Sequence, residues 1–238
     1  VLGNTGNLTR TGYVFGGWNT SSAGTGTSNA AGDTFTMGTA DVTLYAEWVG
    51  ASGRIVFASD VDGDNEIYSM MPDGTDLVQL TSNTVSDVAP KLSPDGTKIA
   101  FARNPSGTGR EIFVMNVDGS NVIRLTNNLF DELHPAWSPD GSQIVYQRDQ
   151  NIYRMNADGS GVQALTSSGL GNRHPDWSPD GQQIAFTSEA DGNHEVYVLT
   201  ISTGVGVNLT NSSTSVDVWP RWSPDGSQIL FHSDRDGN

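Results

Sequence analysis

The segment "HPDWSPDGQQIAFTS", residues 174 to 188, decides which fold is expected of this chain. Its centre, S-P-D-G, has the chemistry of a tight turn, because proline restricts φ, aspartate bonds to nearby backbone, and glycine accepts a positive φ without steric cost. The residues "QIAFTS" that follow are rich in apolar, aromatic and β-branched side chains, which are typical of a strand. The segment therefore predicts a turn that leads into a β-strand.

The turn recurs along the chain at a nearly constant spacing. S-P-D-G begins at residues 93, 138, 178 and 223, which gives intervals of 45, 40 and 45 residues. Each repeat continues with a strand, a turn, a second strand such as "EVYVL", another turn, and a short strand that ends near L-T. Four strands in about forty residues are typical of one β-propeller blade. The chain is predicted to be all-β.

A tryptophan occupies one position of this repeat. Trp137, Trp177 and Trp222 each stand directly before S-P-D-G, and Leu92 takes that place in the first repeat. A large aromatic residue that recurs once per blade is most simply a packing element, since it can bury much apolar surface between two sheets. These side chains are predicted to lie between neighbouring blades.

The composition excludes several classes of partner. The chain of 238 residues has a formal net charge of -15, and its 12 Lys and Arg residues form no run, which argues against nucleic acid as a partner. It contains no cysteine, so disulfides, thiolate metal sites and a cysteine nucleophile are excluded. No apolar stretch approaches the length of a transmembrane helix, so we expect no membrane insertion in this segment.

The repeats resemble those of the TolB-like β-propellers. The resemblance is carried by "HPAWSPDGSQIVYQ", "HPDWSPDGQQIAFTS" and "WPRWSPDGSQILFHS", with "EIFVMNVDGSNVIRLT" and "NIYRMNADGSGVQALT" as the second half of a blade. It covers residues 54–238 and implies a propeller that is six-bladed when complete. It says more about fold than about function.

The first fifty residues follow another pattern. "RTGYVFGGWNT", "AAGDTFTM" and "DVTLYAEW" resemble the second half of a Listeria-Bacteroides repeat, the small β-rich module similar to the B-repeat of internalin-type surface proteins. Tyr13, Trp18, Tyr45 and Trp48 are expected to form its core. We expect three regions, which are a partial B-repeat-like module at 1–48, a linker at 49–53, and the propeller at 54–238.

The number of strands predicts an open propeller. Residues 54–81 supply three strands of a first blade without its inner strand, three complete blades follow, and a fifth contributes two strands. The alternative is a four-bladed ring in which residues 218–222 supply the missing inner strand. The open arc is favoured, because repeats of one chemistry should keep a similar angle between blades. Such an arc exposes unpaired strand edges, which promote self-association.

An acidic segment near the start of the propeller has two interpretations. In "SDVDGDNEIY", residues 59 to 68, Asp60, Asp62 and Asp64 have the alternate spacing of a calcium loop. Asn65 stands where such a loop needs its sharp turn, and Met71 where it needs a bidentate glutamate. The segment is interpreted mainly as a hairpin turn, with weak calcium binding as the alternative and no other cofactor expected.

The start of each inner strand carries the candidate binding residues. His134 and His174 stand immediately before the proline of their repeats, where Ala89 and Trp219 stand in two others. Inner strands surround the channel of a propeller, so these side chains and the acidic residues two positions earlier are expected at one channel mouth. They could form a polar rim for a ligand, or make structural hydrogen bonds only, and a metal held by the two histidines is a further alternative. The candidate rim residues are Asp87, Glu132, His134, His174, Asp217 and Trp219.

The resemblances together imply a function and a location. They are consistent with a non-catalytic binding scaffold of a secreted, cell-surface or periplasmic bacterial protein, whose partner is a protein, a peptide or a cell-wall glycan. The alternative is the propeller domain of an enzyme, similar to prolyl oligopeptidase-type peptidases or oligogalacturonate lyases. No G-x-S-x-G motif is present, so the chain itself is expected not to be an enzyme.

Overall fold

The computed structural model of this chain describes most of the repeat region and part of the N-terminal module. The described residues are 13–21, 27–29, 43–50, 53–61, 63–105, 107, 109–167, 169–212 and 214–237. Every regular element among them is a β-strand, and the strands form antiparallel sheets, so the predicted all-β class is confirmed. Within these ranges no helical segment has the length and apolar character required to cross a bilayer.

The N-terminal module contributes one three-stranded sheet. Its central strand β1 (Tyr13–Asn19) lies between β2 (Ser28–Asn29) and β3 (Tyr45–Gly50). Trp18 is half-buried, but Tyr45 is 41% exposed, so the prediction that Tyr45 belongs to the core is wrong. The side chains of Tyr13 and Trp48 lie outside the described residues. Strand β3 continues two residues into the region predicted as linker, and the three domain boundaries stay a prediction.

The propeller region forms five sheets in chain order. The first is three-stranded, the next three have four strands each, and the last has two. Their strands are β4 (Ile55–Ser59), β5 (Glu66–Met70) and β6 (Val78–Gln79); β7 (Asp87–Leu92), β8 (Lys98–Arg103), β9 (Glu111–Asn116) and β10 (Ile123–Arg124); β11 (Glu132–Trp137), β12 (Gln143–Arg148), β13 (Asn151–Asn156) and β14 (Gln163–Ala164); β15 (Arg173–Trp177), β16 (Gln183–Ser188), β17 (Glu195–Thr200) and β18 (Val205–Asn208); β19 (Asp217–Trp222) and β20 (Ile229–Ser233).

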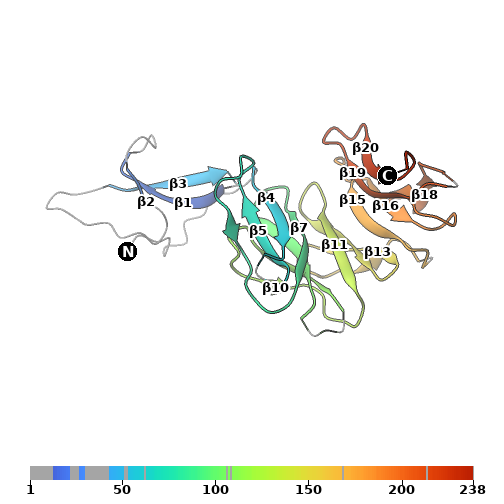
Figure 1. Cartoon of the computed structure of the whole chain (residues 1–238), viewed down its shortest axis with the longest axis horizontal. Coiled ribbons are helices and arrows are strands. Elements are labelled where there is room, and N and C mark those ends of the chain that lie inside the picture. Colours follow the sequence, from blue (N-terminus) through green and yellow to red (C-terminus); the bar gives the residue numbers. More distant parts are fainter. Residues whose placement is uncertain are drawn as a thin grey trace.

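The sheets form an open arc. Figure 1 shows them following one another, with the β4 sheet and the β19 sheet at the two ends of the row. Strand β19 pairs with β20, and among the described strands β4 pairs only with β5. The open arc is therefore confirmed, and the alternative four-bladed ring, in which residues 218–222 pair with the first blade, is wrong.

The core lies between neighbouring sheets rather than within one of them. One apolar cluster joins side chains of β8 and β9 to those of β11, β12 and β13, with Trp137 packed against it. The next cluster joins β11, β12 and β13 to β15, β16 and β17, and it contains the buried Trp177. The prediction that these tryptophans pack between blades is confirmed. Trp137 also donates a hydrogen bond from Nε1 to the Lys91 carbonyl of the preceding blade at 3.1 Å.

The S-P-D-G turn has the conformation expected from its residues. In the third blade Ser138 Oγ donates to Asp140 Oδ1 at 2.6 Å and accepts from Gln143 N at 2.9 Å. Gly141 has a φ of 70°, a value that residues with a side chain rarely adopt. The turn thus holds inner strand β11 against β12 through side-chain bonds that every repeat can form.

Candidate binding site

The four inner strands β7, β11, β15 and β19 share a bulge at the residue that precedes proline. The pairing register with the next strand shifts there in each sheet. The residues before proline have φ values of 53° at Ala89, 53° at His134, 54° at His174 and 60° at Trp219. Positive φ is uncommon for residues other than glycine, and bulges redirect the side chain they carry. The repeat therefore presents one specially oriented side chain per blade.

Three of these side chains meet. The ring of His174 stacks on that of Trp219 with centroids 3.6 Å apart and an interplanar angle of 18°. The ring of His134 meets both edge-on, at 4.6 Å from His174 and 4.9 Å from Trp219. Since these rings come from strands β11, β15 and β19, the arc of blades brings together residues that are 85 positions apart, from 134 to 219.

A cavity of about 480 Å³ lies beside this ring cluster. Its described lining includes three cationic side chains and no carboxylate, although the chain has 27 Asp and Glu residues and 12 Lys and Arg residues. The lining residues are Val88, Ala89, Pro90, Lys91, Arg110, Leu133, His134, Pro135, Pro175, Trp219 and Arg221.

The three cations of the cavity differ in how they are neutralised. Arg110 is paired with Asp131, to which its Nε and Nη2 donate at 2.8 and 2.5 Å. Arg221 lies 3.8 Å from Asp176, a distance too long for a hydrogen bond. Lys91 is half-buried, and no hydrogen bond joins its Nζ to any residue that the structure describes. The cavity thus has at least one positive charge without a direct partner.

Sequence reasoning missed these cations, although the repeat contains a signal for two of them. Lys91 and Arg221 occupy the variable position of P-x-W-S, where the third and fourth blades carry Ala136 and Asp176. Arg221 therefore faces an aspartate of the preceding blade, whereas the blade after Lys91 offers alanine. Arg110 precedes β9, and no position of the repeat predicts that it lines the cavity.

Burial and the neighbouring cations keep both histidines of the ring cluster neutral. Burial is the main cause that lowers the pKa of His134 to about 4, with Arg221 and Arg110 adding to it. Burial likewise lowers the pKa of His174 to about 3, assisted by His134 and Arg221. The cluster is therefore an uncharged aromatic surface at neutral pH, next to charged side chains.

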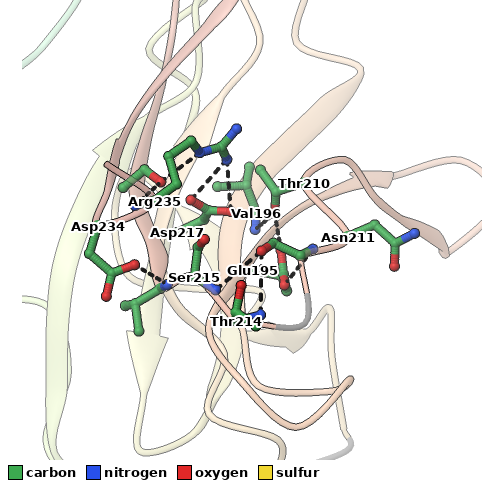
Figure 2. A network of polar contacts seen from close by, with 12 residues as sticks. Glu195, Val196, Thr210, Asn211, Thr214, Ser215, Asp217, Asp234 and Arg235 are labelled. Carbon is green, nitrogen blue, oxygen red and sulfur yellow. Dashed lines mark hydrogen bonds and ion pairs between the residues drawn. The ribbon is translucent and has the colours of Figure 1, made fainter. Parts of the chain in front are cut away.

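The three acidic rim candidates have other surroundings. Asp87 and Glu132 are fully buried and accept hydrogen bonds from Arg103 and Arg148 at the end of the next strand, at 2.6 and 2.8 Å. Asp217 is also fully buried and accepts from Arg235 at 3.1 Å, as Figure 2 shows. None of the three lines the cavity described above. The structure brings His134, His174 and Trp219 together and places the carboxylates in ion pairs inside the blades.

In three of the blades a buried glutamate at the start of the third strand bonds to the loop that follows the outer strand. Figure 2 shows Glu195 at the centre of such a network, where it accepts hydrogen bonds from the Thr210 hydroxyl and from the Ser212 backbone at 2.8 Å. Glu66 and Glu111 have the same position in two earlier blades. These networks satisfy loop donors and are structural.

The acidic segment at residues 59 to 68 forms the hairpin between β4 and β5. Gly63 N donates to the Asp60 carbonyl at 3.0 Å, so the prediction of a hairpin turn is confirmed. Asp62 lies outside the described residues, and calcium binding by Asp60, Asp62 and Asp64 stays a prediction. Among the residues described, no group of three or more His, Cys, Asp or Glu side chains is arranged to hold a metal ion, and His134 and His174 contact an indole instead.

Three known families match parts of the chain. Residues 2–47 match the Listeria-Bacteroides repeat domain, residues 78–177 the TolB beta propeller domain, and residues 141–238 the Tricorn protease N-terminal beta propeller domain. The two propeller matches overlap across the third blade and the start of the fourth. The same repeat is thus recognised by two related propeller families.

Relatives with known names share short segments with the chain. A protein TolB homolog of Chlorobium luteolum is 48% identical over 54 residues, which are 23% of this chain and 12% of the relative. A putative Gly-rich membrane protein of Evansella cellulosilytica is 56% identical over 41 residues, 17% of this chain and 5% of the relative. Both matches span only a small part of the relatives' length.

The fold is similar to that of solved TolB structures. TolB from Acinetobacter baumannii matches with a TM-score of 0.67 at 22% identity, over 76% of this chain and 47% of that one. At this identity the likeness shows the fold alone. The chain thus matches the Listeria-Bacteroides repeat in its first part and TolB-like β-propeller repeats in the part that follows.

Proposed function

We propose that the propeller is a non-catalytic binding module that holds a polypeptide in the cavity between its inner strands. One observation supports this most directly, which is the meeting of His134, His174 and Trp219 beside a cavity of about 480 Å³. Binding cavities for small ligands and peptide segments commonly measure about 300 to 1,000 Å³ and combine apolar walls with a few polar groups. Trp219 is 44% exposed, so its ring is available to a ligand.

The described lining of the cavity offers no hydroxyl, thiol or carboxylate for nucleophilic or acid–base catalysis. Its described lining includes no Ser, Thr, Cys, Asp or Glu, so His134 has neither a hydroxyl nucleophile to activate nor a carboxylate to orient it there. Binding without reaction is the activity that this lining supports.

A location at the bacterial cell envelope fits the same proposal. The relative from Evansella cellulosilytica is named a Gly-rich membrane protein, and the N-terminal repeat matches a family implied to occur in surface proteins. A propeller held at the envelope can present its cavity to an exported or surface polypeptide.

The test compares an aromatic variant with a matched control on arrays of peptides and glycans. Trp219→Ala removes a cavity ring, whereas Val205→Ala shortens an exposed apolar side chain on the outer strand β18. We expect the protein and Val205→Ala to bind a common set of peptides, and Trp219→Ala to lose at least about tenfold in affinity for them. Exclusive binding of glycans, or binding that is unchanged in Trp219→Ala, contradicts the proposal.

A second candidate function rests on the match of residues 141–238 to the propeller of a protease. In that case the propeller admits a peptide to a catalytic domain of a longer protein. Incubating the natural full-length protein with the peptides selected above distinguishes the two functions. Cleavage detected by mass spectrometry supports the enzyme propeller, and intact peptides support the binding module.

A further inference from the structure

The charge of the cavity is opposite to that of the chain. The chain has a formal net charge of -15, yet three Lys and Arg residues line this one cavity and no Asp or Glu among the described residues does. A surface with this contrast attracts and orients an anionic group, although Asp131 already pairs with Arg110 and Asp176 lies 3.8 Å from Arg221.

Lys91 is the cation best placed to receive that group. It is one of two lysines in the chain, and the other, Lys98, donates to Asn116 Oδ1 at 2.6 Å. Lys91 has no such acceptor among the described residues. The carboxylate that acts on it electrostatically is Asp176, whose Oδ2 already accepts a hydrogen bond from Trp222 N at 2.9 Å. A half-buried ammonium without an acceptor is costly, so a ligand carboxylate that accepts from it gains a charge-assisted bond.

The walls of the cavity favour a polypeptide over a sugar or a free anion. Apart from the cations and rings, the lining is Val88, Leu133, Ala89 and three prolines. Sugar hydroxyls need acceptors as well as donors, and the side chains described along the cavity wall include no Asp, Glu, Asn, Gln, Ser or Thr. A free inorganic anion leaves the apolar walls unused. A peptide that carries a carboxylate beside an apolar side chain uses both parts.

We propose that the cavity binds an acidic polypeptide segment, whose carboxylate is held by Lys91 with Arg221 beside it and whose apolar neighbour lies against the prolines and the ring cluster. This inference rests on the proposed binding function and names its ligand class. The carboxylate is an aspartate or glutamate side chain or a chain terminus, and no covalent step is involved.

The experiment uses a pair of peptides that differ only in charge. N-acetyl-Leu-Glu-Leu amide and its Leu-Gln-Leu counterpart are titrated against the protein, with tryptophan fluorescence and NMR shifts as readouts. We expect the Glu peptide to bind at least about tenfold more tightly, and Lys91→Gln to remove this preference. Lys98→Gln is the matched control, because it removes the same charge from the same sheet outside the cavity, and it should change the affinity less than about twofold. Circular dichroism and urea unfolding verify that each variant is folded.

The remaining outcomes separate the inference from the function it rests on. If both peptides bind equally and Trp219→Ala loses this binding, the carboxylate anchor is overturned and the proposed binding function is retained. If neither peptide binds and no peptide on the arrays binds, both the carboxylate anchor and the proposed binding function are overturned. Preferential binding of trigalacturonate overturns the polypeptide assignment, and so does displacement of the Glu peptide by an equal concentration of inorganic phosphate.

Discussion

At the scale of single residues, the neutral histidines of the ring cluster make the free energy of unfolding depend on pH. His134 is surrounded by the cavity cations Lys91, Arg110 and Arg221 and by one carboxylate, that of Asp131. Its pKa in the folded protein is about 4 and that of His174 about 3, both below the ordinary value of 6.5. At a pH between the folded pKa and the ordinary value of 6.5, the unfolded chain binds more protons than the folded one. The free energy of unfolding therefore decreases as the pH falls below about 6.5.

We predict that replacing both histidines by asparagine makes the protein less sensitive to acid. Asparagine cannot take up the proton, and it tolerates the positive φ of this position better than most residues. Between pH 7 and pH 4.5 the natural protein should lose on the order of 2 kcal/mol more per histidine than the double variant, after allowance for solvent screening. Urea unfolding at the two pH values measures this difference. Equal losses in both proteins contradict it.

At the scale of the blade, the repeat shows how a buried ion pair can be replaced. Glu132 of β11 is paired with Arg148 at the end of β12, and the corresponding residues of the next blade are Asn172 and Ser188. The acid and the arginine are thus absent together in that blade. Removing one partner of a buried ion pair leaves an uncompensated charge, whereas removing both does not.

We predict that Arg148→Ser lowers the free energy of unfolding by about 3 kcal/mol and that adding Glu132→Asn restores at least half of this loss. Restoration stays incomplete, because the Arg148 guanidinium also lies over the Tyr153 ring at 4.5 Å from its centroid. Urea unfolding of the two single variants and the double variant gives the coupling energy. A double variant that is as unstable as the sum of the single ones would show that the pair is not coupled.

At the scale of the whole molecule, the open arc leaves strand edges without partners. One edge of β4 and one edge of β20 pair with no strand in the part of the chain that the structure describes. Each of these strands has five residues, and Ile55 of β4 is 42% exposed. Unpaired edges of this length can template pairing with another chain.

We predict that the 238-residue chain associates reversibly with itself and that Ile55→Lys weakens this association. A charged side chain on an exposed edge opposes strand addition. Ile123→Lys is the matched control, because it makes the same exchange on the two-residue outer strand β10, which is too short to template a partner. Sedimentation velocity over a range of concentrations measures the effect. A strictly monomeric chain at every concentration contradicts the prediction.

Most of the fold could be predicted from local sequence. The S-P-D-G turns, the alternation of the strands and the spacing of the repeats are short-range features, since each depends on residues within one blade. They determined the all-β class, the order of strands in each sheet, the open arc and the packing place of Trp137. The equivalent position before the proline of each inner strand also predicted that His134, His174 and Trp219 lie at one channel mouth.

Only the tertiary structure decided which charges surround those rings. Acidic residues at Asp87, Glu132 and Asp217 looked equally suited to the channel mouth, but each is held inside its blade by an arginine. Lys91, Arg110 and Arg221 come from β7, the loop before β9 and β19, and they converge only because the angle between successive blades brings these elements around one cavity. Pairing of charges across blades depends on that angle and on distances between residues far apart in the chain, which no local pattern specifies.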